Sequence, residues 1–190
     1  IVVWNYVQNY KKNRKNILSI VDKVLQSGQL ILSKEVENFE NNFAKFTKNN
    51  FGIGVNSGTD ALQIALMAIG VKQNDEVITV SNTAVPTVSA IVACGAKPIY
   101  VDISEKDFLI DISLIEEKIS NKTKAIIPVN LYGQSANYEA INKIAKKYNI
   151  KVIEDCAQSS GAFYKGKPSG SFGDLAAFSF YPTKNLGGYG

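Results

Sequence analysis

The chain has 190 residues, of which 45% are hydrophobic and 20% charged, and its formal net charge of +4 is spread along the sequence. This length and composition are typical of one globular domain with a substantial core, or of most of such a domain. Histidine is absent, which excludes Ser-His-Asp hydrolysis, Cys-His catalysis and His-ligated zinc from this stretch of chain.

Two amphipathic helices are predicted first. Apolar side chains recur at helical spacing across residues 11–27 and 34–46, and Gly28 follows the first helix as a stop. The basic residues at 11–15 fit a solvated helix face better than a nucleic-acid patch. The apolar stripe of the second helix is expected in a core or a subunit interface, and consists of Val36, Phe39, Phe43 and Phe46.

From residue 51 onward, short apolar runs alternate with longer amphipathic ones. Strands are predicted at 51–55, 76–80, 98–101, 125–129, 152–155 and 175–180. Helices are predicted at 60–69, 85–93, 112–119 and 138–148. Alternation of this kind implies right-handed crossovers and a mostly parallel sheet covered on both faces. We therefore expect an α/β, three-layer sandwich over residues 51–190, preceded by an N-terminal helical segment, residues 1–50.

The remaining composition bears on the setting of the protein. Cys94 and Cys156 lie far apart within apolar segments, as expected of reduced core thiols. No apolar run reaches the roughly 18 residues of a membrane span, and no signal peptide is visible. We expect a cytoplasmic protein with no metal site and with neither a nucleic-acid nor a membrane partner.

In an open parallel sheet, ligands bind at the carboxyl ends of the strands, where helix N-termini present free N–H groups. After the predicted strand 51–55, the small residues Ser57, Gly58 and Thr59 lead directly into a helix. Their backbone N–H groups, backed by the helix dipole, could cup a phosphate. The same residues also fit an ordinary helix N-cap formed by Ser57 or Thr59.

Two adjacent acids, Glu154 and Asp155, end another predicted strand. Their side chains must point to opposite sides, so one should face the ligand-binding cleft. A buried carboxylate at that point is costly unless a cation is its partner. The alternative is that Asp155 merely caps the following turn.

A lysine follows the last predicted strand. Lys184 lies in a loop that ends in glycines, and on its own it would be an ordinary surface side chain. A phosphate cup, a strand-end carboxylate and a loop amine together are what pyridoxal phosphate requires: an anion site, a partner for its pyridine nitrogen, and an amine that holds its aldehyde as a Schiff base.

Several motifs carry a resemblance to a known family. They are Ser57-Gly58-Thr59-Asp60-Ala61-Leu62, Asn82-Thr83-Ala84-Val85-Pro86-Thr87, Asn130-Leu131-Tyr132-Gly133-Gln134, Glu154-Asp155-Cys156-Ala157-Gln158-Ser159 and Phe178-Ser179-Phe180-Tyr181-Pro182-Thr183-Lys184-Asn185-Leu186-Gly187. In this order they resemble the DegT/DnrJ/EryC1/StrS family of pyridoxal-phosphate-dependent sugar aminotransferases, which have fold type I. The resemblance covers the chain from near Trp4 to Gly190.

The resemblance implies a catalytic role for Lys184, which would carry pyridoxal phosphate and then move a proton between the substrate carbon and the cofactor. It implies that Asp155 pairs with the pyridinium nitrogen and that Gln158 contacts the ring or its 3-hydroxyl. The phosphate would lie in the cup of Ser57, Gly58 and Thr59, together with the Ser179 hydroxyl.

Three features depart from the family's pattern. Many relatives place an aromatic residue over the cofactor ring in the loop where this chain has Ala84 and Val85, so Val85 is expected to cover the ring by apolar contact. Family members are nearly twice as long and have a smaller C-terminal domain, so the chain is expected to be a large domain incomplete at its C-terminal end. Arg14 is the single arginine, so no arginine of the catalytic segment could clamp a donor carboxylate.

The reaction implied is transfer of an amino group from L-glutamate to a keto carbon of a nucleotide-linked deoxysugar, with a dTDP-linked 3-keto-6-deoxyhexose as first expectation. A C4-keto sugar, or a small keto substrate without a nucleotide, are the alternatives within the family. A homodimer is expected as well. Lys184 argues against a dehydratase relative, which has histidine there, and a plain nucleotide-binding module would have no use for Asp155 and Lys184.

Overall fold

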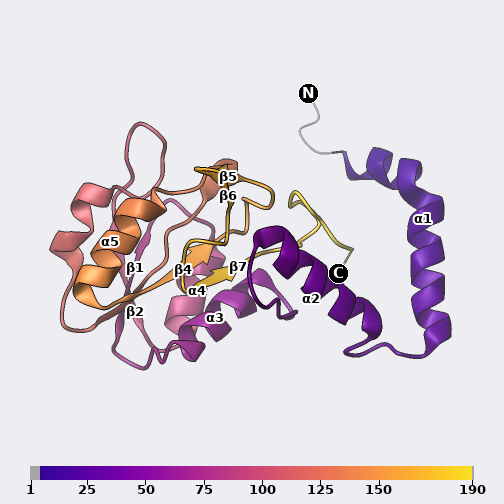
Figure 1. Ribbon diagram of the computed structural model, residues 1–190, viewed down its shortest axis with the longest axis horizontal. Helices are drawn as coiled ribbons and strands as arrows, with labels where there is room; N and C mark the ends of the chain where they lie inside the picture. The colour runs from indigo at the N-terminus through magenta and orange to yellow at the C-terminus, as the bar shows by residue number, and fades with distance from the viewer. Residues whose placement is uncertain (1–4, 190) are drawn as a thin grey trace. The chain divides into compact units, whose positions relative to one another are not determined.

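The computed structural model describes residues 5–189 and divides into two compact units (Figure 1). The first unit contains the residues up to 46 together with residues 50–54, and the second contains residues 47–49 and those from 55 onward. None of the described helices combines the length and the apolar character that a membrane crossing requires.

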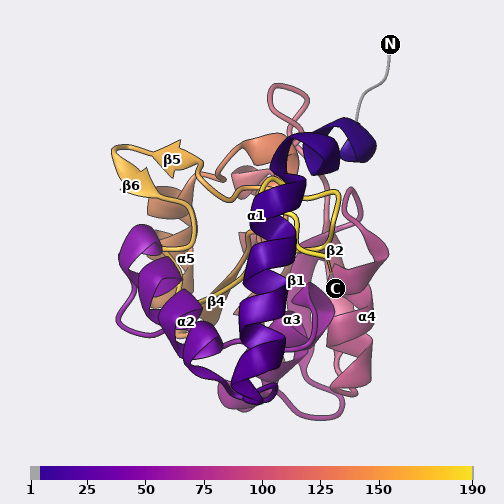
Figure 2. The same ribbon diagram turned by 90° about the vertical axis from the view of Figure 1, so that its right-hand side faces the viewer.

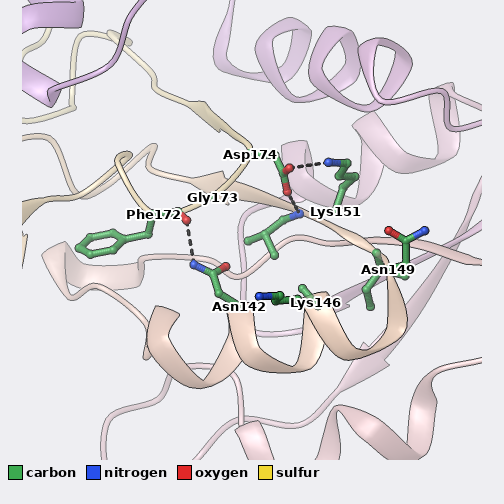
Figure 3. A pocket seen from close by; sticks show the side chains of 10 residues that line it. Asn142, Lys146, Asn149, Lys151, Phe172, Gly173 and Asp174 are labelled. Carbon is green, nitrogen blue, oxygen red and sulfur yellow. Dashed lines mark hydrogen bonds and ion pairs between the residues drawn. The ribbon is translucent and has the colours of Figure 1, made fainter.

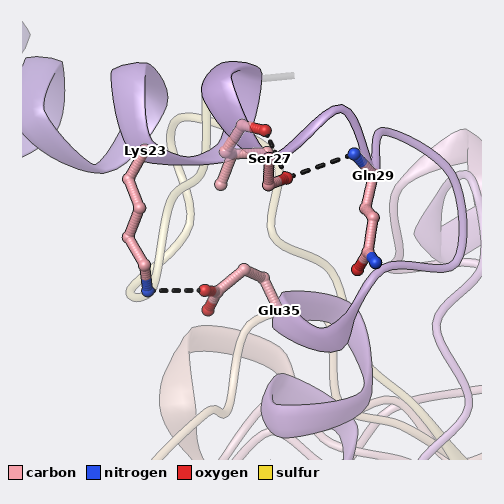
Figure 4. Close-up of polar contacts among 5 residues, drawn as sticks. Lys23, Ser27, Gln29 and Glu35 are labelled. Carbon is pink, nitrogen blue, oxygen red and sulfur yellow. Dashed lines mark hydrogen bonds and ion pairs between the residues drawn. The ribbon is translucent and has the colours of Figure 1, made fainter.

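The first unit consists of two helices, α1 (Tyr6–Ser27) and most of α2 (Lys34–Thr47). Helix α1 begins earlier than predicted because Asn5 caps it, with its side chain accepting a hydrogen bond from the Gln8 N–H. It ends at Gly28, as predicted, in the left-handed conformation (φ +67°). Figure 4 shows the connection to α2, where the Gln29 N–H donates to Ser27 Oγ (3.1 Å) and Lys23 Nζ pairs with Glu35 Oε1 (2.8 Å).

The prediction of a strand at residues 51–55 is wrong. The segment has an extended, apolar pattern, but a strand needs a partner for its N–H and C=O groups, and this segment pairs with no strand among the described residues. Within the first unit it lies along α2 instead: the Gly54 N–H donates to Glu40 Oε1 (2.6 Å), and a Cβ at Gly52 would lie 2.5 Å from the Glu40 carbonyl oxygen.

The second unit is built on a parallel sheet with strand order β2-β1-β3-β4-β7. The strands are β1 (Glu76–Val80), β2 (Lys97–Val101), β3 (Thr123–Ile126), β4 (Lys151–Asp155) and β7 (Leu175–Ala177). The helices are α3 (Gly58–Ala68), α4 (Val85–Ala93) and α5 (Tyr138–Tyr148). A short antiparallel hairpin of β5 (Phe163–Tyr164) and β6 (Lys167–Pro168) was not predicted.

The sheet is the middle layer of three, as predicted. Alternate strand residues enter two separate cores, because successive side chains of a strand point to opposite faces. Ile78, Ile126 and Val152 pack with the buried face of α5, whereas Val77, Ala125 and Ile153 pack with α3 and α4. Figure 2 shows α5 and α4 on opposite sides of strands β1 and β4.

Three predicted elements are shorter or different. The helix predicted at 112–119 is two 3₁₀ turns, η1 (Ile112–Leu114) and η2 (Glu116–Lys118), because the Asp111 side chain binds both the N–H and the hydroxyl of Ser113 and tightens the first turn. Strand β3 stops before Pro128, which has no N–H to donate. Strand β7 stops at Ala177 because its neighbour β4 ends at Asp155, the residue that pairs with Ala177.

Candidate functional site

The predicted site residues meet at the carboxyl edge of the sheet. Asp155 is the last residue of β4, and Ser179 follows the last residue of β7, the neighbouring strand. Helix α4 begins where the chain leaves the carboxyl end of β1. The N-terminus of α3 reaches the same edge, because a Cβ at Gly58 would lie 3.0 Å from the Cβ of Ser179, which comes after β7.

Asp155 is nearly buried, with 4% of its surface exposed. Its Oδ2 accepts a hydrogen bond from the Thr87 hydroxyl (2.7 Å) and its Oδ1 accepts one from the Ala157 N–H (3.1 Å), so it also caps the next turn. Burial raises the pKa of Asp155 from its ordinary value, while Thr87, Ala157 and the positive charge of Lys184 act to lower the pKa. Lys184 therefore lies within electrostatic reach of Asp155.

Glu154 points to the other side of β4, as predicted, and is completely buried. Three backbone N–H groups bind its carboxylate: those of Gly170 (2.8 Å), Phe172 (2.5 Å) and Gly173 (2.7 Å). Burial raises the pKa of Glu154, and these N–H groups act to lower the pKa. Backbone donors thus take the place of a cation at Glu154, which holds the 170–173 loop and is separate from the candidate site.

The segment that begins α3 forms the helix N-cap and also leaves the backbone N–H groups of the predicted phosphate cup open. The Ser57 hydroxyl caps the helix by accepting from the Asp60 N–H (3.1 Å), and it donates to the Asp60 carboxylate (3.0 Å). The N–H groups of Gly58 and Thr59 make no backbone hydrogen bond within residues 5–189 and remain available to an anion. A Cβ at Gly58 would lie 3.0 Å from the Ser179 Cβ, so the Ser179 side chain stands against this cup.

Lys184 is half-buried in a loop closed by its own backbone. The Lys184 N–H donates to the Tyr181 carbonyl (2.8 Å) and the Gly188 N–H donates to the Phe180 carbonyl (2.8 Å). A side chain at Gly187 would collide with the Pro182 carbonyl, which explains a glycine at the return of this loop.

A cavity of about 310 Å³ lies beside this loop, lined by Tyr132, Gly133, Gln158, Thr183, Lys184 and Asn185. Two predicted site residues, Lys184 and Gln158, therefore share one cavity. Asp155 and the α3 cup do not line it. The Gln158 Oε1 accepts from the Tyr132 N–H (3.0 Å), so the amide nitrogen of Gln158 is the end left to face a ligand.

Two residues of this region had no predicted role. Thr87, in the first turn of α4, bonds to Asp155, and Tyr132 orients Gln158 from a backbone conformation with φ +57°. A signal for Thr87 existed in the sequence, because Thr83 and Thr87 stand four residues apart at the start of a predicted helix. Val85 lies in the same turn and is 76% exposed, which leaves it accessible to a ligand at this edge.

Gly133 tests the turn at residues 132–133, in which both residues have a positive φ. Its φ is +78°, and a Cβ there would meet only the Gln158 carbonyl oxygen, at 3.7 Å. Gly133→Ala is therefore expected to lower the free energy of unfolding by about 1–2 kcal/mol through backbone strain alone. Urea denaturation measures this change, and Gly133→Asn, which tolerates the left-handed conformation better, should lose less. Equal stability of the alanine variant and the wild type would contradict the conformation described.

A larger cavity, of about 350 Å³, opens at the opposite end of β4, beside the C-terminal part of α5 (Figure 3). Several of its polar groups bond to one another: Asn142 Nδ2 donates to the Phe172 carbonyl (2.8 Å), and Asp174 binds both Lys151 Nζ (2.7 Å) and the Val152 N–H (2.9 Å). Because these groups are already satisfied, we place the functional site at the Lys184 cavity despite its smaller volume.

Comparison with known proteins identifies the family of the chain. The sequence profile of the DegT/DnrJ/EryC1/StrS aminotransferase family matches residues 11–190. The dTDP-3-amino-3,4,6-trideoxy-alpha-D-glucose transaminase of Micromonospora megalomicea subsp. nigra is 48% identical over 188 residues, which are 99% of this chain and 50% of that protein.

Solved structures of related proteins share the fold. DesV of S. venezuelae, in complex with a ketimine intermediate, has a TM-score of 0.94 and 40% identity, covering 96% of this chain and 49% of that chain. NtdA from Bacillus subtilis, with bound cofactor PMP, has a TM-score of 0.89 and 38% identity, covering 94% of this chain and 40% of that chain. The chain thus spans about half the length of the proteins it matches, and it belongs to the DegT/DnrJ/EryC1/StrS aminotransferase family.

Proposed function

We propose that the protein is a pyridoxal-phosphate-dependent aminotransferase that moves an amino group from L-glutamate to a keto carbon of a nucleotide-linked deoxysugar. The observation that carries the proposal is that the buried Asp155, at the end of β4, and Lys184, in the loop after the neighbouring strand β7, come to the sheet edge where α3 presents unbonded N–H groups. An amine, a carboxylate and an anion cup are the three groups that this cofactor needs.

The residues present fit the cofactor. The cup of Gly58 and Thr59 offers two N–H groups, the positive end of a helix dipole and the adjacent Ser179 hydroxyl to a phosphate. Ser57 contributes by shaping the helix start, since its own hydroxyl is bonded to Asp60. Asp155 belongs to none of the ion pairs found within residues 5–189, so its charge is available to a cationic ring nitrogen.

Each residue then has a distinct task. When bound, pyridoxal phosphate supplies an aldehyde that captures amines and a protonated ring that accepts electrons. Lys184 would hold the cofactor through its aldehyde, and its amine, when free, would move a proton to and from the substrate carbon. Asp155 would keep the ring nitrogen protonated, and the amide nitrogen of Gln158 would be free to donate to the cofactor. Val85, exposed at the start of α4, would cover the ring by apolar contact.

A dTDP-linked 3-keto-6-deoxyhexose is the proposed acceptor. Support comes from the Micromonospora relative, whose name specifies a dTDP sugar with a 3-amino group. A C4-keto sugar and a small keto substrate without a nucleotide are the other candidates. The second unit contains no arginine, so a glutamate carboxylate held by this unit would contact other side chains.

We also propose that the protein acts as a homodimer in the cytoplasm. Supporting the dimer, α1 has no buried residue along its length, and its apolar side chains Leu18, Val21 and Leu25 are exposed, as expected if another polypeptide segment covers them.

The substrate proposal is tested with the purified protein, added pyridoxal phosphate and a panel of dTDP- and UDP-linked sugars carrying a keto group at C3 or C4. With glutamate as donor, mass spectrometry is expected to detect the amino sugar from the dTDP-linked 3-keto substrate first. Turnover of a C4-keto sugar alone would reassign the acceptor. Failure of glutamate to change the visible spectrum of the bound cofactor would remove glutamate as donor.

The α3 cup makes a separate prediction. Gly58→Val should weaken binding of pyridoxal phosphate by at least about tenfold, because a Cβ at Gly58 already reaches 3.0 Å from the Ser179 Cβ and larger groups must enter the cup. Gly58→Ala should have a smaller effect in the same direction. Equilibrium titration with the cofactor measures both. A folded valine variant with wild-type affinity would show that the phosphate lies elsewhere.

A further inference from the structure

Thr87 and Thr83 form a hydroxyl pair behind Asp155. Thr87 Oγ1 lies 2.7 Å from Asp155 Oδ2, and Thr83 Oγ1 lies 2.8 Å from Thr87 Oγ1. Thr87 is 1% exposed, so water does not replace these contacts. The three groups come from a loop, the first turn of α4 and the end of β4, so their meeting is a product of the tertiary fold.

The direction of the hydrogen bonds in this hydroxyl pair depends on whether the Asp155 carboxylate is ionised or protonated. A hydroxyl has one proton to donate. When Asp155 is ionised, Thr87 gives its proton to Oδ2 and must accept from Thr83. When Asp155 is protonated at Oδ2, it donates this proton to Thr87 Oγ1 instead. Thr87 then donates to Thr83, so the hydrogen bonds of both hydroxyls reverse direction. Because the Ala157 N–H donates to Oδ1, the ionised form has a protein donor on each oxygen.

Apart from the Thr87 and Ala157 hydrogen bonds, few groups around Asp155 favour its ionised form. Among the described residues, Lys184 is the one charged group that acts to lower the pKa of Asp155. The other titratable groups that sense its charge are Cys156 and Tyr138, both fully buried, and the Asp155 charge raises the pKa of each of them. Against the cost of burial, the Thr87 hydroxyl is the strongest of the groups that favour the carboxylate.

We propose that Thr87, backed by Thr83, is a positioning residue that fixes the Asp155 carboxylate in one orientation and favours its charged form, ready for a protonated ring nitrogen. The part of this inference that concerns the ring rests on the proposed function. The part that concerns the carboxylate does not, because it follows from contacts within the chain.

Three substitutions in the purified protein test the proposal. Thr87→Val removes the hydroxyl at nearly constant volume, Thr87→Ser retains it, and Thr83→Val removes only the donor behind it. Thr79→Val is the matched control, because Thr79 is an equally buried threonine whose hydroxyl donates to the Ile127 carbonyl (2.9 Å) and not to Asp155.

The first readout needs no cofactor. Carboxyl ¹³C NMR of the cofactor-free protein follows the titration of Asp155, and its midpoint should rise in Thr87→Val, rise less in Thr83→Val, and stay near wild type in Thr87→Ser and Thr79→Val. The second readout is affinity for pyridoxal phosphate, which Thr87→Val should weaken by about ten- to hundredfold, the scale of a lost hydrogen bond to a charged group.

The outcomes separate the two proposals. An Asp155 titration that is unchanged in the valine variants overturns the role of Thr87, whether or not the cofactor binds. If Thr87→Val does not fold, Thr83→Val decides, since it leaves Thr87 in place. A wild-type protein that takes up no pyridoxal phosphate, but whose Asp155 midpoint rises in the valine variants, refutes the proposed function and keeps the inference about Thr87.

Discussion

Replacement of Lys184 by alanine is expected to abolish transamination. The loop closed by the Lys184 and Gly188 N–H groups holds this amine at the cavity that Gln158 also lines, within electrostatic reach of Asp155. Loss of its proton transfer alone should lower kcat by about 10²–10⁴-fold, and the covalent attachment of the cofactor is lost as well.

Steady-state assays with the wild-type protein, Lys184→Ala and Lys184→Arg measure this effect. The arginine variant keeps the charge but cannot form the covalent bond, so it should be as inactive as the alanine variant. Lys97→Ala, at the exposed amino end of β2, serves as the control and should be fully active. An alanine variant within about tenfold of wild-type activity would remove Lys184 from the chemistry.

Asp155→Asn should lower activity and raise stability. In the loaded enzyme, a neutral amide cannot stabilise a protonated ring nitrogen, so kcat should fall by about 10²–10³-fold, the scale seen when one preorganised electrostatic contact is removed. The visible spectrum of the bound cofactor should also change its pH dependence, because the ring nitrogen loses its anionic partner.

In the cofactor-free protein, the effect of Asp155→Asn on stability depends on pH. Because burial raises the pKa of Asp155 above the ordinary value of 3.8, the native state keeps this proton to higher pH than the unfolded chain does. The resulting stabilisation is complete below the ordinary pKa and is lost as pH rises through the raised pKa.

Asparagine cannot titrate, so the variant should be more stable than the wild type at neutral pH, and the difference should shrink as pH falls. Urea midpoints measured at several pH values check this expectation. Glu105→Gln, the same kind of acid-to-amide change at an exposed position, is the control. A stability gain that grows toward acid pH would contradict a pKa of Asp155 that burial raises above its ordinary value.

Local signals in the sequence were sufficient for much of the fold. Helices α4 and α5 occur at the predicted bounds, because Pro86 stands in the first turn of α4 and Asn137 and Asn149 cap the two ends of α5. The failure at residues 51–55 has a non-local cause. A run such as Phe51–Val55 has the alternation of a strand, but whether a strand forms depends on a neighbour that local pattern does not specify.

The candidate site divides in the same way. Asp155 and Lys184 were identifiable because each ends or follows a predicted strand, and parallel strands bring such positions to one edge. The contact between Thr87 and Asp155 joins residues 68 positions apart, and the φ of +57° at Tyr132 belongs to a residue type that rarely adopts it. The spacing of Thr83 and Thr87 indicates a pair but not its partner, and no propensity indicates the φ at Tyr132, so both features required the structure.

The most direct test of the account is to find where the cofactor attaches. The purified protein, incubated with pyridoxal phosphate and reduced with borohydride, should lose its visible absorption band and carry one stable pyridoxyl group, which peptide mass mapping should locate on Lys184. A pyridoxyl group on another lysine, or scattered over many exposed lysines with none on Lys184, would contradict the site described here.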